Sequence, residues 1–458
     1  MGLTAVLDRE RTIAGPGFNR WLIPPAALAI HLSIGQVYAF SVFKTPLVER
    51  FGTSLTPIGI IFSIAIVMLG LSAAFGGRWV EHNGPRKAMT LSALCWSTGF
   101  LVSAVGVAGG QLWLVYLGYG FLGGIGLGIG YISPVSTLIK WFPDRPGLAT
   151  GLAIMGFGGG ALVASPLSAH LLETYANSPA NAVEPAFLTL GLGYLVVMLL
   201  GAFTVRVPAA DWSPPNWTPS QRVAGADAGP SSGMTAVTAM RTKQFWLLWT
   251  VLFCNVTAGI GILEQAAPMI ADFFSEVNAA EAAGFVGVLS LCNMTGRFVW
   301  SSTSDLLGRR RTYIGYLGIG GLLYVLVATT GTASVAWFVL LTGVIISFYG
   351  GGFATVPAYL KDLFGVREVG AIHGRLLTAW SAAGIAGPLI VNAVADSQTA
   401  AGRSGADLYT LSLFVMVGFL VVGFVANLLI RPVSARESTH DTASAQRVAD
   451  AQASTRRS

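Results

Sequence analysis

The chain has 458 residues, of which 53% are hydrophobic and only 10% are charged, and its mean hydropathy is +0.65. Soluble domains carry about 25% charged residues, so this composition excludes a soluble protein and makes a lipid bilayer the solvent. The formal net charge of +6 does not indicate nucleic-acid binding, because the basic residues are distributed by membrane topology.

Twelve apolar runs follow one another along the chain, each long enough to cross about 30 Å of hydrocarbon as a helix. A barrel strand would need only about ten residues of alternating character, which these runs lack. The sequence therefore predicts an all-α membrane protein with twelve transmembrane helices. The runs cover residues 21–43, 57–76, 88–108, 112–138, 148–170 and 184–205, and then 245–270, 283–303, 312–331, 334–356, 371–394 and 408–430.

A polar stretch rich in Pro, Ser, Gly and Ala separates the two groups of six runs. It holds too few apolar residues to fold alone and is typical of a flexible linker. We expect an N-terminal six-helix half at 1–206, a cytoplasmic linker at 207–243, a C-terminal half at 244–430 and a cytoplasmic tail at 431–458. The first run is too long for a signal-peptide core, so it is expected to remain uncleaved.

The basic residues predict the orientation. If both termini and the even-numbered connections share one side, that side holds 23 of the 27 Lys and Arg residues. The other side holds Lys44, Arg50 and Arg403, and Arg297 lies inside a run. By the positive-inside rule, both termini and the linker are cytoplasmic. We expect a multi-pass monomer in the cell membrane, in contact with the lipid bilayer.

Two segments, GRWVEHNGPRK and SSTSDLLGRRR, repeat one pattern after the second run of each half. A second region agrees at a nearly identical offset, which indicates a parallel repeat of the two halves. The matches are Glu81, Gly84 and Arg86 with Asp305, Gly308 and Arg310 at an offset of 224, and Pro134, Gly147 and Gly151 with Pro357, Gly370 and Gly374 at 223.

An acidic residue followed by glycine and a basic cluster at this place resembles the major facilitators, which implies their twelve-helix fold. The charges of the motif have two interpretations. They are either simple topogenic charge or a lock between helix ends that holds one face closed, and we favour the lock because carboxylates near the membrane are costly unless paired.

Arg297 lies about eight residues before Asp305, hence about 12 Å along the helix from the end of the span. An arginine so deep costs about 2.5 to 3.5 kcal/mol, so it predicts a functional site. Its planar fork can hold a carboxylate through two parallel hydrogen bonds. A purely structural ion pair, with Glu264 of the seventh run as the partner, is the alternative.

Further polar positions in the runs are weaker candidates. Asn293 lies one helical turn before Arg297, and Gln36 and Tyr38 interrupt the first run, although packing hydrogen bonds explain all three equally well. His31 is expected to be a structural histidine. Glu264 is a candidate for proton coupling, although a place in the aqueous vestibule is the favoured reading.

The sequence predicts no enzyme. The glycine-rich segments 121–131 and 151–161 lack the Lys-Ser/Thr ending of a phosphate loop, and small residues at these spacings favour close helix packing. No nucleophilic constellation or zinc spacing is present, so neither a cofactor nor a metal is expected, and no nucleic-acid partner.

Several stretches resemble the oxalate/formate antiporter family, a major facilitator branch near the monocarboxylate carriers. They are GQVYAFSVFKTPL, KWFPDRPGLATGLAIMGFG, GRFVWSSTSDLLGRR and TAWSAAGIAGP. The resemblance implies transport of small carboxylates and places the family's substrate-binding arginine at Arg297. The family's oxalate carriers also have a lysine in the eleventh helix, where this chain has Trp380. One cation instead of two favours a monocarboxylate over a dianion.

These observations predict a secondary carrier for a small organic anion. The anion would bind in a cavity lined by Arg297, Asn293, Gln36, Tyr38 and Trp380. The carrier would work by alternating access, coupled to a proton or to an exchanged anion. Two alternatives stay open at this point. An exporter of cationic or hydrophobic drugs would want a carboxylate in the cavity, and a nutrient sensor would bind its ligand without flux.

Overall fold

The computed structural model describes residues 6–53, 55–175, 179–209, 212–215, 233–277 and 279–433. These residues form helices, connecting loops and two isolated β-bridges, so the predicted all-α fold is confirmed. About half of the predicted linker and nearly all of the predicted tail lie outside the described residues.

The N-terminal half consists of six membrane-crossing units, several of which are divided. Its elements are α1 (Ile23–Ile34) with the 3-10 helix η4 (Gly35–Phe43), α2 (Lys44–Phe51), α3 (Leu55–Asn83), α4 (Pro85–Ala108), α5 (Leu112–Val115) with the π-helix η5 (Tyr116–Gly123) and α6 (Gly124–Trp141), α7 (Pro146–Tyr175) and α8 (Pro179–Thr204).

The C-terminal half repeats this arrangement after the short helix α9 (Ala236–Met240). Its elements are α10 (Lys243–Phe273), α11 (Ala279–Leu307), α12 (Arg309–Thr330), α13 (Val335–Phe364), α14 (Val369–Leu376) continuing into α15 (Thr378–Ala400), and α16 (Asp407–Leu429). Eleven helices of the described chain are long and apolar enough to span a membrane. The twelfth is α11, which carries Arg297.

Most helices extend beyond the apolar runs that predicted them. Helix α3 continues to Asn83, seven residues past the run that ends at 76, and α13 continues to Phe364, eight residues past 356. Hydropathy falls where charged residues begin, whereas backbone hydrogen bonding can continue into the interfacial region. The sequence therefore located each span but not its full length.

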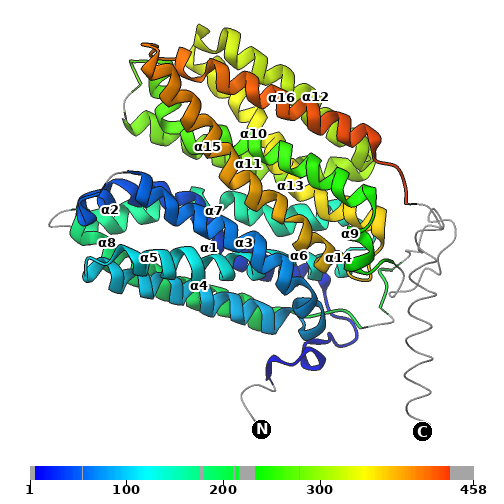
Figure 1. Cartoon of the computed structure of the whole chain (residues 1–458). Helices are drawn as coiled ribbons and strands as arrows, with labels where there is room; N and C mark the ends of the chain where they lie inside the picture. Colours follow the sequence, from blue (N-terminus) through cyan, green and yellow to red (C-terminus); the bar gives the residue numbers. More distant parts are fainter. Residues whose placement is uncertain are drawn as a thin grey trace.

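The two halves lie side by side, the N-terminal half blue to cyan and the C-terminal half green to red (Figure 1). Helices α3 and α7 of the first half pack against α11, α13, α14 and α15 of the second. We call the end of the bundle that carries α9, the start of α7 and the last residues of α16 the terminal face, and the other end the opposite face.

Small residues bring the backbones of the two halves together near the terminal face. A Cβ at Gly374 of α14 would overlap the carbonyl oxygen of Ala73 in α3. Further along the same seam, the Ser381 hydroxyl donates to the carbonyl oxygens of Ile66 (3.3 Å) and Val67 (3.2 Å). These contacts explain why the repeat carries glycine at this position, since any side chain would separate the halves.

The seam is looser toward the opposite face. On α11, a Cβ at Gly284 or Gly287 would meet no atom of the described residues within 4 Å, whereas nearer the terminal face Ser301 of α11 contacts Gly151 of α7. The two halves therefore touch most closely at the terminal face and at the centre of the bundle.

An ion pair anchors the start of the first helix to the loop before α7. The Arg20 guanidinium donates to both carboxylate oxygens of Asp144, at 2.7 and 3.0 Å, and stacks 4.5 Å over the Phe142 ring. Burial alone would raise the pKa of Asp144, but the Arg20 hydrogen bonds hold this pKa below its usual value. The pair therefore stabilises the fold at neutral pH, and this stabilisation is lost as the pH falls through the acidic range.

Replacing Gly374 by Ala should open the terminal face. The added methyl group cannot fit against Ala73 while the halves are closed, and overpacking of this kind costs about 1 to 3 kcal/mol. Spin labels at the exposed positions His82 and Arg367, one on each half, should show longer distances by electron paramagnetic resonance.

Gly418→Ala in α16 is the matched control, because a Cβ there meets no atom within 4 Å. The control should leave the distance distribution unchanged. An equal shift in both variants, or no shift in either, would contradict the close packing at Gly374.

Candidate functional site

Arg297 is fully buried at the centre of the molecule, with 0% of its surface exposed. Its Nε donates to the Asn293 side-chain oxygen at 2.9 Å, and its Nη1 donates to the Ile154 carbonyl of α7 at 3.2 Å. Its Nη2 has no hydrogen-bond partner within the described part of the chain. Both halves therefore bind the guanidinium, through Nε and Nη1, while its Nη2 has no acceptor among the described residues.

Aromatic rings enclose the guanidinium. The Phe157 ring of α7 lies 5.5 Å from its carbon, and the Phe353 ring of α13 lies 5.4 Å from it. Trp380 of α15 packs against both rings, with centroid distances of 5.4 and 4.4 Å. Tyr131 of α6 packs on Trp380 at 5.4 Å. Rings oriented in this way attract the cation weakly and exclude water from it.

Tyr38 and Tyr349 close the enclosure from the two halves. Their hydroxyl groups are 3.1 Å apart and hydrogen-bonded, Tyr38 from η4 and Tyr349 from α13. Tyr38 also packs edge-on against Phe157 and interacts electrostatically with Arg297. Tyr349 lies 15 residues from the terminal end of α13, and Arg297 lies ten residues from that end of α11. At about 1.5 Å per residue, the tyrosine pair is about 7 Å nearer the opposite face.

The structure brings four of the five sequence-predicted pocket residues together: Arg297, Asn293, Tyr38 and Trp380. Gln36 lies elsewhere, because its side-chain oxygen accepts a hydrogen bond from Tyr119 at 2.9 Å inside the N-terminal half. The backbone of Glu264 belongs to α10, but its side chain lies outside the described residues. The described chain offers Arg297 no carboxylate partner.

Several neighbours of Arg297 were not predicted from the sequence: Phe157, Phe353, Tyr131 and Tyr349. The sequence contained evidence for one of them. Phe157 and Trp380 are separated by 223 residues, the offset of the internal repeat in this region, and they meet across the seam. Residues related by a parallel repeat occupy equivalent places in the two halves, so this aromatic pair could have been inferred.

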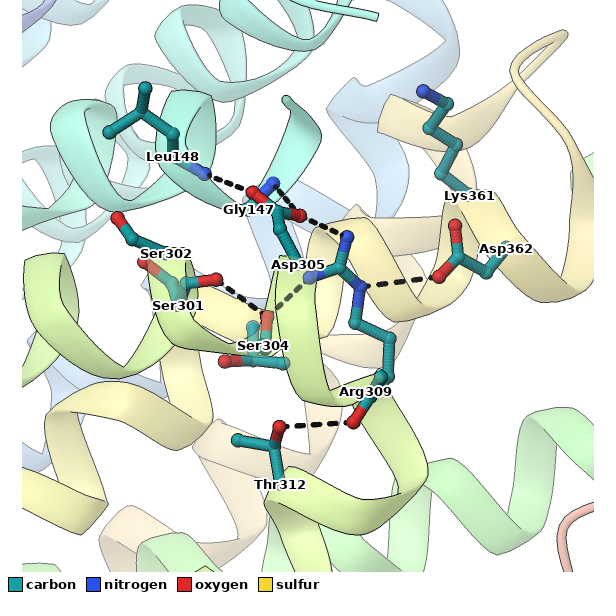
Figure 2. Close-up of polar contacts among 12 residues, drawn as sticks. Gly147, Leu148, Ser301, Ser302, Ser304, Asp305, Arg309, Thr312, Lys361 and Asp362 are labelled. Atoms are coloured by element: carbon teal, nitrogen blue, oxygen red, sulfur yellow. Dashed lines mark hydrogen bonds and ion pairs between the residues drawn. The ribbon is translucent and has the colours of Figure 1, made fainter. Parts of the chain in front are cut away.

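Asp305, at the end of α11, joins the two halves at the terminal face (Figure 2). Its two carboxylate oxygens accept the backbone N–H groups of Gly147 and Leu148, each at 3.0 Å, at the start of α7. The first N–H groups of a helix have no partner within the helix, and the positive end of its dipole attracts an anion. The carboxylate from one half therefore caps a helix of the other.

Basic side chains surround this cap. Arg309 pairs with Asp305 and also donates to Asp362 at 3.2 Å. Lys361 reaches across the seam and donates to the Pro143 carbonyl at 3.0 Å. The charged network thus fixes α11, α12 and α13 to the loop before α7 at the terminal face (Figure 2).

The matching copy in the N-terminal half is similar in geometry and different in pairing. Glu81 pairs with Lys140, and a Cβ at Gly370, near the start of α14, would overlap the Glu81 carboxylate. Gly84 and Gly308 both have a positive φ, 86° and 85°, at the N-caps of α4 and α12. Only glycine adopts this backbone conformation without strain, which explains the matched glycines of the motif.

The predicted arginines of the motif do not contact its carboxylates. Arg86 donates to the carbonyl of Phe203 at the end of α8, and Arg310 donates to the carbonyl of Leu428 at the end of α16. Each arginine therefore ties the motif to the sixth membrane-crossing helix of its own half. Arg309, the residue before Arg310, makes the contact with Asp305 instead.

Replacing Asp305 by Asn should loosen the start of α7. The amide keeps one acceptor oxygen but loses the charge that favours the helix N-terminus and Arg309, a loss of about 1 to 2 kcal/mol. Hydrogen exchange in a peptide containing Gly147 and Leu148 should accelerate by about 5- to 30-fold when followed by mass spectrometry.

Asp362→Asn serves as the matched control, because Asp362 is half exposed and touches Arg309 without capping α7. It should leave exchange in this peptide nearly unchanged. Unaltered exchange in the Asp305 variant would show that the carboxylate does not hold α7.

Comparison with known proteins agrees with this architecture. A family model described as Major Facilitator Superfamily matches residues 26–299 and, in an overlapping second match, 266–457. The chain is 27% identical over 418 residues to the oxalate:formate antiporter of Oxalobacter formigenes, covering 91% of this chain and 93% of that protein. It is 24% identical over 388 residues to apicoplast pyruvate carrier 1 of Toxoplasma gondii, covering 73% and 69%.

A solved structure shares the fold. FucP, a major facilitator transporter in the outward conformation, aligns with a TM-score of 0.67 and 14% identity, covering 91% of this chain and 100% of that one. The matching family and relatives are transporters, which confirms the expectation that the chain is not an enzyme. The chain belongs to the Major Facilitator Superfamily of multi-pass membrane transporters, as the repeated motif and the twelve predicted spans had indicated.

Proposed function

We propose that this transporter carries small organic anions, with a monocarboxylate as its substrate, by alternating access between its two halves. The observation that carries the proposal is Arg297, a fully buried guanidinium at the seam whose Nη2 has no partner among the residues that the structure describes. A carboxylate bound there would supply both the missing acceptor and the missing negative charge.

The surroundings of Arg297 compensate its charge only in part. Neutral acceptors from Asn293 and Ile154 and two aromatic faces contribute modestly, about 0.5 to 2 kcal/mol for each ring. A charge in a medium of low dielectric constant attracts a counter-ion strongly, and the cost of burying it favours a partner of opposite sign. A small anion between the halves satisfies that requirement, whereas a cationic drug would add to the unfavourable charge.

The charge of the enclosure favours a small monoanion. Arg297 is its cation, and the bulky Trp380 occupies the position where the resemblance to oxalate carriers implies a lysine. The relatives described as an oxalate:formate antiporter and a pyruvate carrier support small carboxylates as the substrate class.

The contacts that close the two faces support the proposal of alternating access. The Asp305 cap and the Arg309 network close the terminal face, while the Tyr38–Tyr349 pair separates Arg297 from the opposite face. Breaking the tyrosine pair would admit the anion from one side, and breaking the cap would release it to the other.

We further propose that the terminal face is cytoplasmic, because 23 of the 27 basic residues belong to the termini and the connections assigned to that side. The protein would then lie in the cell membrane with both termini inside, as a monomer. Either a proton or an exchanged second anion would drive transport.

Arg297→Gln should abolish carboxylate uptake. The variant loses the charge and the fork that bind the anion, and hydrogen bonds to charged groups contribute about 1.5 to 3 kcal/mol, so uptake should fall by about 10- to 100-fold or more. Uptake of labelled formate, lactate and pyruvate into reconstituted vesicles measures the effect.

Arg403→Gln is the control, since it removes an exposed arginine in the loop between α15 and α16. Both variants should express and purify like the parent chain. Full uptake by the Arg297 variant would show that this residue does not bind the substrate.

Trp380→Lys should shift selectivity toward dianions, because a second cation near Arg297 attracts a second carboxylate. In a thermal-shift panel, formate, lactate and pyruvate should raise the unfolding temperature of the parent chain more than oxalate does. The lysine variant should reverse that order. A parent chain stabilised most by oxalate would contradict the monocarboxylate assignment.

A further inference from the structure

His31 lies at the centre of the N-terminal half in an unusual hydrogen-bond environment. Its ring is 0% exposed and is held between two backbone carbonyl oxygens. Nδ1 faces the carbonyl of Ala153 in α7, and Nε2 lies 3.1 Å from the carbonyl of Tyr131 in α6. The imidazole is therefore flanked by two groups that can only accept hydrogen bonds.

The two acceptors favour a ring that carries two protons, although burial by itself disfavours the charged ring. A neutral imidazole has one N–H donor and one lone pair, so one of its nitrogens would direct a lone pair at a carbonyl lone pair. Protonation of that nitrogen converts the repulsive contact into a second hydrogen bond. The two carbonyls thus form a prepared acceptor pair for an imidazolium cation.

The same turn of α7 connects His31 to Arg297. The Ala153 carbonyl faces His31, and the next carbonyl, that of Ile154, accepts from Arg297 Nη1 at 3.2 Å. Arg297 therefore acts electrostatically on His31. Two cations so close repel each other in a medium of low dielectric constant, and an anion on Arg297 removes much of that repulsion.

We propose that His31 is a proton-binding site whose occupancy is linked to the anion at Arg297, so that the protein transports the carboxylate together with a proton. This inference rests on the proposed function. The proton comes from water on the side to which the site is open and binds the unprotonated ring nitrogen, which then donates to the carbonyl facing it. After the halves rock and the anion leaves, repulsion from Arg297 releases the proton from the same nitrogen to water on the other side.

Tyr131 and His373 are the titratable groups that α6 and α14 place near His31. The Tyr131 ring of α6 stacks on His31 at 5.4 Å, and His373 of α14 lies beyond it, 5.8 Å from the Tyr131 ring. Both nitrogens of His373 lack a hydrogen-bond partner among the described residues, so its surroundings offer no acceptor for a second proton.

The remaining helices around His31 place their titratable groups elsewhere. Helix α7 carries none between Ala153 and His170, a separation of 17 residues or about 25 Å. Tyr194 of α8 packs on Trp96 and Phe100, and Arg86 of α4 donates to Val6 and Phe203 near the terminal face. Arg297 is thus the charge through which an anion can act on His31.

The test measures protons taken up when an anion binds to the purified full chain. Formate, lactate and pyruvate are titrated calorimetrically in phosphate and in Tris, whose ionisation enthalpies differ, so the difference in heat counts the protons. The parent chain should take up close to one proton per anion. Above the pH at which His31 becomes neutral, anion affinity should fall by about tenfold per pH unit.

His31→Gln should bind the anion without taking up a proton, and its affinity should not change with pH. His373→Gln is the matched variant and should keep the proton uptake of the parent chain. If His31→Gln does not fold, the pH dependence of affinity in the parent chain still decides the question, because an unlinked site would bind equally well across the pH range.

Three results would overturn the inference: anion binding by the parent chain without proton uptake, proton uptake that persists in His31→Gln, or its loss in His373→Gln. Failure of all three acids to bind the parent chain would instead refute the anion-transport proposal on which the inference rests. The two failures are therefore distinguishable.

Discussion

The cost of a guanidinium charge inside a membrane protein shapes the centre of this molecule. Arg297 lies on the seam with no exposed surface, and both halves contribute to its enclosure: Asn293 and Phe353 from one, Ile154 and Phe157 from the other. Neutral groups cannot fully compensate a cation in a low dielectric. The site is therefore poised for an anion, and movement of either half changes the surroundings of the charge.

At the terminal face, the charges of Asp305 and Arg309 are paired with groups of opposite charge. There the Asp305 carboxylate meets the positive end of α7 and the Arg309 guanidinium, so both charge and hydrogen bonds are satisfied. Glu81 occupies the related place in the other half but pairs with Lys140. The paired Asp305 carboxylate closes one face, whereas Arg297 at the centre keeps a donor with no partner among the described residues, and this contrast separates a closing contact from a binding site.

A proton on His31 would place a second positive charge near Arg297, and this charge would respond to the bound anion. Adjacent carbonyls of α7 face His31 and Arg297, so a single turn of helix connects the proposed proton and anion sites. Because the interaction is between charges, neither site needs a large structural change to sense the other. The loaded centre adds one negative charge from the anion and one positive charge from the proton to that of Arg297, so its net charge is the same as that of the empty centre and the buried charge does not change during transport.

The sequence by itself determined the twelve helices, the repeat and the unusual depth of Arg297, because hydrophobic length, fixed offsets and a charge within an apolar run are local properties of the chain. It placed Asn293 beside Arg297, since both lie on one helical turn. Only the tertiary structure separated Tyr38 from Gln36: residues two apart on a helix face different neighbours, and here one meets Tyr349 and the other Tyr119. Likewise, only packing across the seam could reveal Phe353, Tyr349 and the two carbonyls around His31, because contacts between distant helices leave no mark on local hydropathy.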